Sequence, residues 1–161
     1  DVLMLQKQHK QAIPFYRRAA KANPRDLRTA ARLARAYLAA GEAEKSLKLY
    51  RALRQQAPQS IKLLFGELRC LLALSRLEEA EKQLTTVGKR FKPGMRLLLQ
   101  GELWRRQGKW KQAKQALLQV VELGPDTEEA WEQLLQIADQ TKDHALAKRA
   151  RHQLQRIRSS R

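Results

Sequence analysis

Residues 27–58 read LRTAARLARAYLAAGEAEKSLKLYRALRQQAP, and this stretch decides the fold. Ala30, Leu33 and Tyr37 recur at intervals of three and four residues, which places them on one face of a first helix. Gly41 favours the left-handed conformation that ends such a helix, and Pro58 stops the helix that follows. Neither helix can bury its apolar stripe alone, so the pair requires neighbouring helices.

The same pattern recurs along the chain with a period close to 34 residues. One column of small residues consists of Ala12, Ser46, Ala80, Ala113 and Ala147. A second column consists of Tyr16, Tyr50, Leu84, Leu117 and Arg151. Prolines recur at Pro24, Pro58, Pro93 and Pro125. Self-similarity at this period is typical of a stack of repeated structural units.

These residues resemble the tetratricopeptide-repeat (TPR) family, whose unit is a helix–turn–helix of about 34 residues. The second-helix part of the family pattern, a small residue, an aromatic residue and a proline, is the better kept: the residues are Ala12, Tyr16 and Pro24, then Ser46, Tyr50 and Pro58, then Ala113, Leu117 and Pro125. The third unit departs in its first helix, which has Glu67, and the last unit has Arg151 where an aromatic is usual. The resemblance implies an all-α, right-handed α-solenoid of antiparallel helix pairs.

We expect a single array over residues 1–161, with units at about 1–26, 27–60, 61–93, 94–127 and 128–161. Because the chain begins at Asp1, without an initiator methionine and with an incomplete unit, we interpret it as a piece of a longer protein. In the first unit, residues 1–6 are expected to be the remnant of a first helix. Residues 8–22 are expected to be its partner, with Pro14 near the start of that helix. The residues expected to point inward are Ala12, Phe15, Tyr16 and Ala19.

Helix starts are predicted from capping residues. Asp26 is expected to cap the helix that follows it, because its carboxylate can accept the first unpaired backbone N–H groups. Ser75 with Glu78, and Asp126 with Glu129, have the spacing of a capping box and are expected to start two further helices.

The composition limits the classes of function. A formal net charge of +17 and a pI of about 10.7 predict attraction to acidic partners: polyanions, anionic surfaces or acidic peptides. Cys70 is the only cysteine, so an intrachain disulfide is excluded, and its place among apolar residues indicates a buried, inert thiol. His9, His144 and His152 lack the spacing of metal ligands, and the sequence has no glycine-rich phosphate loop. We therefore expect no enzyme activity, no cofactor and no metal site.

In the family that this chain resembles, ligands usually lie in a concave groove lined by the first helix of each pair. Arg28, Arg32 and Arg35 share one helix face, away from the apolar stripe of the same helix. Carboxylates of the fifth unit, Glu129, Glu132 and Asp139, predict an acidic end to a groove that is otherwise basic. The candidate partner-binding residues are Arg28, Arg32, Arg35, Lys62, Phe65, Arg69, Leu98 and Arg105.

The predicted function is binding of an acidic peptide or protein segment in this groove, as part of an assembly scaffold. Clustered guanidinium groups repel one another but suit carboxylates through charge-assisted hydrogen bonds. The competing interpretation of the arginines is a solvated basic helix face.

The alternative function is binding of a polyanion, namely RNA, DNA or an acidic polysaccharide, through the basic surface. The last helix, at about 143–157, has a basic outer face that either contributes to such binding or only caps the array. Membrane contact is expected only through the rest of the parent chain. A composition rich in Ala, Leu, Gln and Arg favours a bacterial source, with the cytoplasm or the cell envelope as the compartment.

Overall fold

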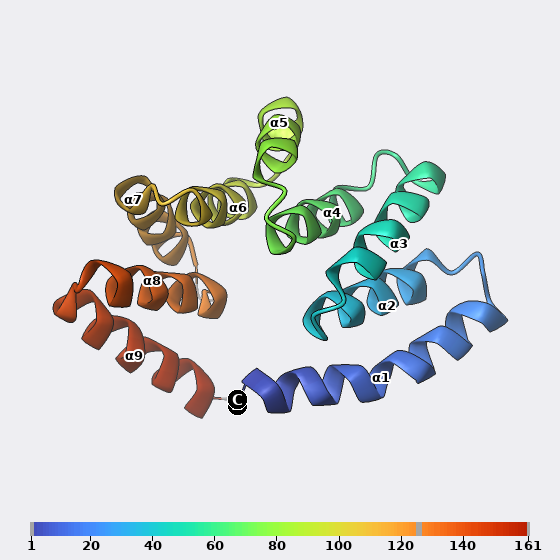
Figure 1. The fold of residues 1–161 in the computed structure, drawn as a ribbon, viewed down its shortest axis with the longest axis horizontal. Coiled ribbons are helices and arrows are strands. Elements are labelled where there is room, and N and C mark those ends of the chain that lie inside the picture. Colours follow the sequence, from blue (N-terminus) through green and yellow to red (C-terminus); the bar gives the residue numbers. More distant parts are fainter. Residues whose placement is uncertain (1, 125–126, 161) are drawn as a thin grey trace. The chain divides into compact units, whose positions relative to one another are not determined.

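The computed structural model describes residues 2–124 and 127–160, with side chains from residue 8 onward. Within these ranges the chain forms α-helices and one short 3₁₀-helix, and no strand (Figure 1). The elements are α1 (Val2–Ala22), α2 (Leu27–Ala39), α3 (Ala43–Gln56), α4 (Ile61–Ala73), α5 (Leu77–Val87), η1 (Gly88–Arg90), α6 (Pro93–Arg106), α7 (Trp110–Glu122), α8 (Glu128–Thr141) and α9 (His144–Ser159). The all-α fold predicted from the repeat period is confirmed.

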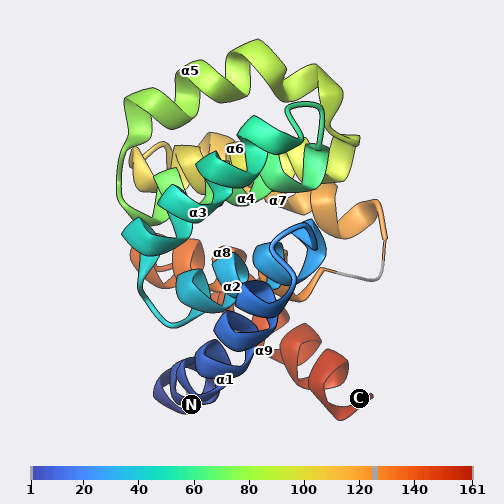
Figure 2. The same cartoon turned by 90° about the vertical axis from the view of Figure 1, so that its right-hand side faces the viewer.

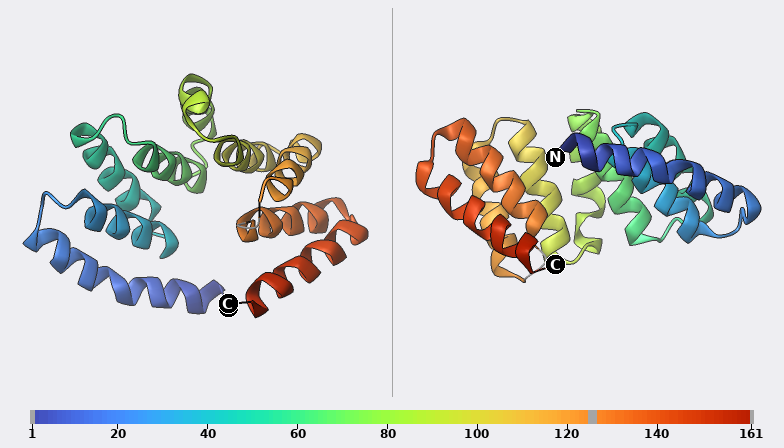
Figure 3. Two further views of the ribbon diagram at one scale, coloured as in Figure 1. Left: turned by 180° about the vertical axis from the view of Figure 1, so that it is seen from behind. Right: turned by 90° about the horizontal axis from the view of Figure 1, so that it is seen from below.

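The chain divides into two compact units, Asp1–Arg76 and Leu77–Arg161. In the first unit, α1 packs on α2, α2 on α3 and α3 on α4, and α4 also touches α2. In the second unit, α5 packs on α6, α6 on α7, α7 on α8 and α8 on α9. Figure 2 shows α1 beside α2, and Figure 3 shows α9 beside α8. The division falls inside the predicted third repeat, 61–93, and one continuous array over the whole chain stays a prediction.

One type of turn recurs at the predicted period. The residues with positive φ are Gly41, Ser75, Gly108 and Lys142, at 84°, 56°, 73° and 56°. After each of them, the next backbone N–H bonds a carbonyl five residues earlier, as from Glu42 to Tyr37 at 2.8 Å. This bond belongs to the Schellman motif, in which a left-handed residue ends a helix. The turn therefore marks the register of the repeats independently of the side chains.

Two predicted capping boxes have different outcomes. Ser75 does not cap α5, because it is itself the left-handed turn residue that ends α4, and α5 begins only at Leu77. Ser75 followed by Glu78 has the sequence pattern of a capping box. Ser75, however, occupies the position that Gly41 and Gly108 hold in other repeats, where the backbone adopts the left-handed conformation. Asp126, in the other predicted box, lies outside the described residues.

Asp26 confirms the third predicted cap. Its carboxylate accepts the backbone N–H of Arg28 at 3.0 Å and of Thr29 at 3.3 Å, and also the Thr29 hydroxyl at 2.6 Å. The hydrogen bond from that hydroxyl is the main cause that lowers the pKa of Asp26. The start of α2, which carries three of the candidate arginines, is therefore fixed by side-chain hydrogen bonds.

The prediction for the first unit was wrong in two respects. Two helices were predicted, at residues 1–6 and 8–22, but α1 is one continuous helix over residues 2–22. Pro14 therefore lies inside the helix rather than near its start. Phe15 is 71% exposed and Ala19 is exposed, because α1 turns another face to α2. Ile13, with half-buried Tyr16 and Ala20, packs in a cluster with residues of α2 and α3. Asp1 lies outside the described residues.

Buried polar contacts tie the helices of the first unit together. Cys70 on α4 donates its thiol to the Ser46 hydroxyl at 3.1 Å, and Ser46 on α3 donates to the Ala34 carbonyl of α2 at 2.6 Å. The carboxylate of Glu67, which is only 2% exposed, accepts hydrogen bonds from Arg51 at 3.3 Å and Arg54 at 2.5 Å. These bonds fix the order of α2, α3 and α4, and therefore the placement of the candidate residues on α2 and α4.

Candidate interaction surface

The three arginines of α2 form an exposed basic face. Arg28, Arg32 and Arg35 are all exposed, whereas Leu33 and Tyr37 on the opposite face are buried. The helix contains no aspartate or glutamate. Among the described residues, no carboxylate lies within ion-pair distance of these three guanidinium groups. The face therefore carries three exposed positive charges, of which that of Arg28 acts on the Asp26 carboxylate: the Thr29 hydrogen bonds and, to a smaller extent, the Arg28 charge lower the pKa of Asp26.

The candidate residues of α4 belong to the same compact unit. Lys62 is exposed, and Phe65 and Arg69 are half-buried. Because α4 touches α2, the unit brings the basic residues of both helices onto neighbouring elements. The placement of Phe65 on the same side as the arginines stays a prediction.

Tyr50 of α3 is buried in the core, as its column in the sequence pattern indicates. Burial raises the pKa of Tyr50, and the positive charges of Arg35 on α2 and Arg69 on α4 oppose that rise. The ring of Tyr50 rests on α4 at Gly66, where a β-carbon would stand 2.3 Å from the Cζ atom of Tyr50. A tyrosine that faces a helical glycine one repeat later is the sequence signal that could have indicated this position.

Leu98 and Arg105 lie on α6 in the second unit. Leu98 is half-buried and packs against the hydrophobic core of that unit. Burial lowers the pKa of Arg105, whose Nε atom has no hydrogen-bond partner in the described part of the chain. Their participation in one site with the residues of α2 and α4 stays a prediction.

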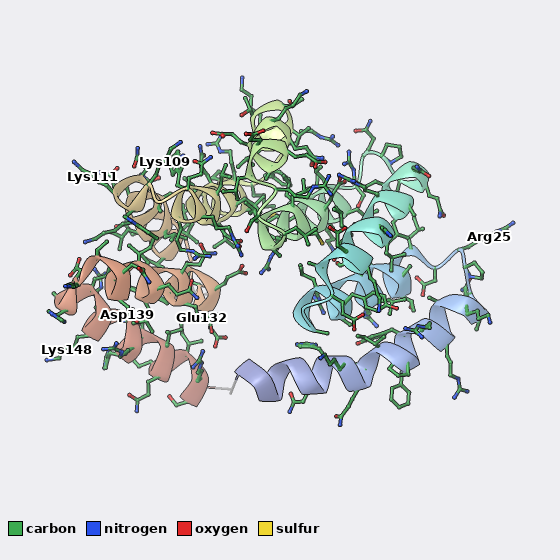
Figure 4. All side chains as sticks on the ribbon, in the orientation of Figure 1. Arg25, Lys109, Lys111, Glu132, Asp139 and Lys148 are labelled. Atoms are coloured by element: carbon green, nitrogen blue, oxygen red, sulfur yellow. The ribbon has the colours of Figure 1, made fainter. Side chains whose placement is uncertain are left out.

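The predicted acidic end is neutralised within the second unit. Arg151 of α9 donates to Asp139 at 3.0 Å, and Arg158 donates to Glu132 at 2.7 Å and to Glu128 at 2.9 Å. Figure 4 shows Glu132 and Asp139 on α8 and Lys148 on α9. Glu128, Glu132 and Asp139 are thus partners of the basic last helix, so the predicted Glu132 and Asp139 do not form a free acidic surface.

The described residues show no group of histidine, cysteine, aspartate and glutamate side chains that could hold a metal ion. Cys70 is buried, as predicted, and burial raises its pKa to about 11, which disfavours the reactive thiolate. Over the same residues, no helix combines the length and the apolar character of a membrane span.

Comparison with known proteins agrees with the repeat register. Two sequence models of the tetratricopeptide repeat match residues 3–62 and residues 98–157. The chain belongs to the tetratricopeptide-repeat family. TPR units generally bind protein partners and are generally not enzymes. The repeats therefore indicate that this chain is a protein-interaction module. No curated protein sequence matches the chain.

Solved structures of TPR proteins share the fold. TTC0263, a thermophilic TPR protein of Thermus thermophilus, has 23% identity and a TM-score of 0.64, over 94% of this chain and 93% of that chain. MamA from Desulfovibrio magneticus RS-1 has 13% identity and a TM-score of 0.62, over 99% of this chain and 94% of that chain. At these identities the likeness supports the fold alone.

Proposed function

We propose that this TPR protein binds an acidic segment of a partner protein on the basic face of α2, supplemented by Lys62 and Arg69 of α4. The observation that carries the proposal is the set of three exposed arginines along about two turns of α2, a helix that contains no aspartate or glutamate. Their mutual repulsion is relieved when carboxylates approach, and guanidinium groups can bind carboxylates through two parallel hydrogen bonds.

Tyr50 of α3 is 6% exposed, and its ring packs on Gly66 of α4, the helix that carries Lys62 and Arg69. Burial raises the pKa of Tyr50, and the positive charges of Arg35 on α2 and Arg69 on α4 both oppose that rise. A carboxylate that binds Arg35 and Arg69 together would accept hydrogen bonds from both α2 and α4. Because the surrounding helices are fixed by buried contacts, the surface is preformed and little rearrangement is expected on binding. A scaffold that holds an acidic partner for assembly is the role that fits such a surface.

The test is fluorescence anisotropy with a labelled peptide of alternating Glu and Leu residues. The variant reverses the charge of Arg28, Arg32 and Arg35 to Glu. If each exposed pair contributes about 0.5–1 kcal/mol, the affinity should fall about 10- to 100-fold. A matched control reverses Lys82, Lys89 and Lys111, three exposed lysines of the second unit, and so makes the same change in net charge. Equal losses in both variants would overturn the assignment of binding to α2.

The net charge of +17 supports a second candidate function, the binding of a polyanion such as RNA. The same two variants distinguish it. A labelled RNA of random sequence should lose affinity equally in both, since non-specific binding follows the total charge rather than one helix face. Affinity for RNA that persists at physiological salt and exceeds affinity for the peptide would place this function first.

A further inference from the structure

The side of α1 that faces away from α2 leaves an aromatic residue exposed. Phe15 is 71% exposed, and with Arg18, Ala19 and Ala22 it lines a hollow of about 400 Å³. Ile13, on the opposite side of α1, packs in a cluster with residues of α2. We call the surface formed by Phe15, Arg18, Ala19 and Ala22 the α1 outer face. Because aromatic rings contribute much of the energy of an interface when they become buried, this face can bind a partner.

The repeat register shows which kind of element covers the same positions in the next pair. Phe15 and Ala19 correspond to Leu49 and Leu53 of α3. Leu53 is buried, and Leu49 packs against a buried cluster made mostly of α2 residues. The α1 outer face is the counterpart of the surface of α3 on which the preceding helix packs. The register therefore predicts a helix as the occupant.

The pair formed by α8 and α9 shows which kind of helix covers a basic helix at these positions. Like α1, α9 contains no aspartate or glutamate. Ala150 and Leu154 are its residues in register with the α1 outer face, and both are buried. The helix that packs on α9 is α8, which contains acidic residues but no lysine or arginine. Glu128 in the first turn of α8 accepts a hydrogen bond from Arg158 in the last turn of α9, so the two helices run antiparallel.

The basic residues beside the α1 outer face have no such partner. Arg18 lines the hollow, and Lys21 lies in the last turn of α1. Both are exposed, and no carboxylate in the described part of the chain lies within ion-pair distance of either. This differs from Arg151 and Arg158 of α9, whose charges are already paired with carboxylates of α8. An occupant with carboxylates therefore gains contacts on α1 that the described residues leave open.

We propose that the α1 outer face docks an amphipathic acidic helix of a partner protein, in the way that α8 packs on α9. Apolar side chains of the docked helix pack on Phe15, Ala19 and Ala22. Its acidic first turn lies against Arg18 and Lys21, so the helix runs antiparallel to α1. A second copy of this chain is disfavoured as the occupant, because each copy carries a net charge of +17. The proposal uses none of the arginines of α2, so it stands or fails independently of the function proposed above.

The probe is a fluorescein-labelled, helix-stabilised peptide with the sequence of residues 127–141, TEEAWEQLLQIADQT, because α8 is the helix of this type within the chain itself. Binding to the whole chain is followed by anisotropy at physiological salt. Phe15→Ala should weaken binding about tenfold by loss of apolar contact, and Arg18→Glu should weaken it about fivefold by like-charge repulsion. Both residues are exposed, so the substitutions should leave the fold intact.

Matched controls lie in the second unit. Leu123 is 60% exposed and Lys111 is exposed, so Leu123→Ala and Lys111→Glu make similar changes away from α1. Both controls should leave the affinity for this peptide unchanged. Reversal of the three α2 arginines should lower it no more than the matched reversal of three lysines described above.

The proposal is overturned if Phe15→Ala and Arg18→Glu bind the peptide like their controls. Two further measurements test other occupants. If sedimentation shows a dimer that Phe15→Ala dissociates, a second copy is the occupant and the proposal is wrong. It is also wrong if the chain binds vesicles of phosphatidylcholine and phosphatidylserine, and Phe15→Ala abolishes that binding without a change in peptide affinity, since a lipid surface is then the occupant.

Discussion

Replacing Lys142 with glycine should stabilise the second unit. Lys142 has a φ of 56° in the turn between α8 and α9, the register position at which two other repeats have glycine. The left-handed conformation costs a residue with a β-carbon about 1–2 kcal/mol. Glycine avoids that cost but loses about 0.5–1 kcal/mol more through its flexibility in the unfolded chain. The expected net gain is about 0.5–1 kcal/mol in the free energy of unfolding, or a rise in Tm of about 2–6 °C.

The assay is urea unfolding followed by tryptophan fluorescence. Trp104, Trp110 and Trp131, the three tryptophans of the chain, all lie in the second unit, so the signal reports on the unit that contains the mutation. Lys148→Gly, inside α9, makes the same chemical change where φ is helical and should destabilise by about 1 kcal/mol. A Lys142→Gly variant that is no more stable than the wild type would show that the turn geometry does not govern stability here.

Three further predictions concern the first unit. Gly66→Ala should destabilise it by about 2 kcal/mol or more, because the new β-carbon would lie 2.3 Å from Cζ of Tyr50, and Tyr50→Leu should recover much of the loss in the double mutant, as measured by circular dichroism. The Cys70 thiol, with a pKa of about 11, should react with Ellman's reagent at pH 8 only after unfolding in urea; fast labelling of the folded protein would contradict its burial. Because the hydrogen bond from Thr29 lowers the pKa of Asp26, the wild type should exceed Asp26→Asn in stability at neutral pH, and the difference should disappear as the pH falls through the lowered pKa; a constant difference from pH 7 to pH 2 would contradict this.

The sequence predicted the paired helices because their signals are local. The apolar spacing in α2, the glycine at position 41 and the capping aspartate at position 26 each act within a few residues, and each was found in the expected place. Ser75 could not be predicted in the same way. A serine is common at caps and uncommon in the left-handed conformation, so only the register of the neighbouring turns identifies its role.

The wrong predictions concern residues whose burial or ion pairing depends on which other helix packs against them. Phe15 was expected to be buried against a preceding helix, but α1 is continuous and only the face containing Ile13 meets α2. The carboxylates of α8 were expected to be free, since spacing along one helix does not show that Arg151 and Arg158 of the next helix reach them. Exposure of the α2 arginines, in contrast, follows from their position opposite the apolar stripe.

The contact between Tyr50 and Gly66 restricts how such a chain can lengthen during evolution. Repeat arrays can gain units by tandem duplication, and a duplicate of residues 27–60 inserted directly after the original would keep the register of 34 residues set by Gly41 and Ser75. The position now held by Gly66 would then be held by the copy of Arg32. Its β-carbon would collide with the ring of Tyr50 at 2.3 Å from Cζ. The second repeat therefore cannot be followed by its own duplicate unless one of these two positions also mutates.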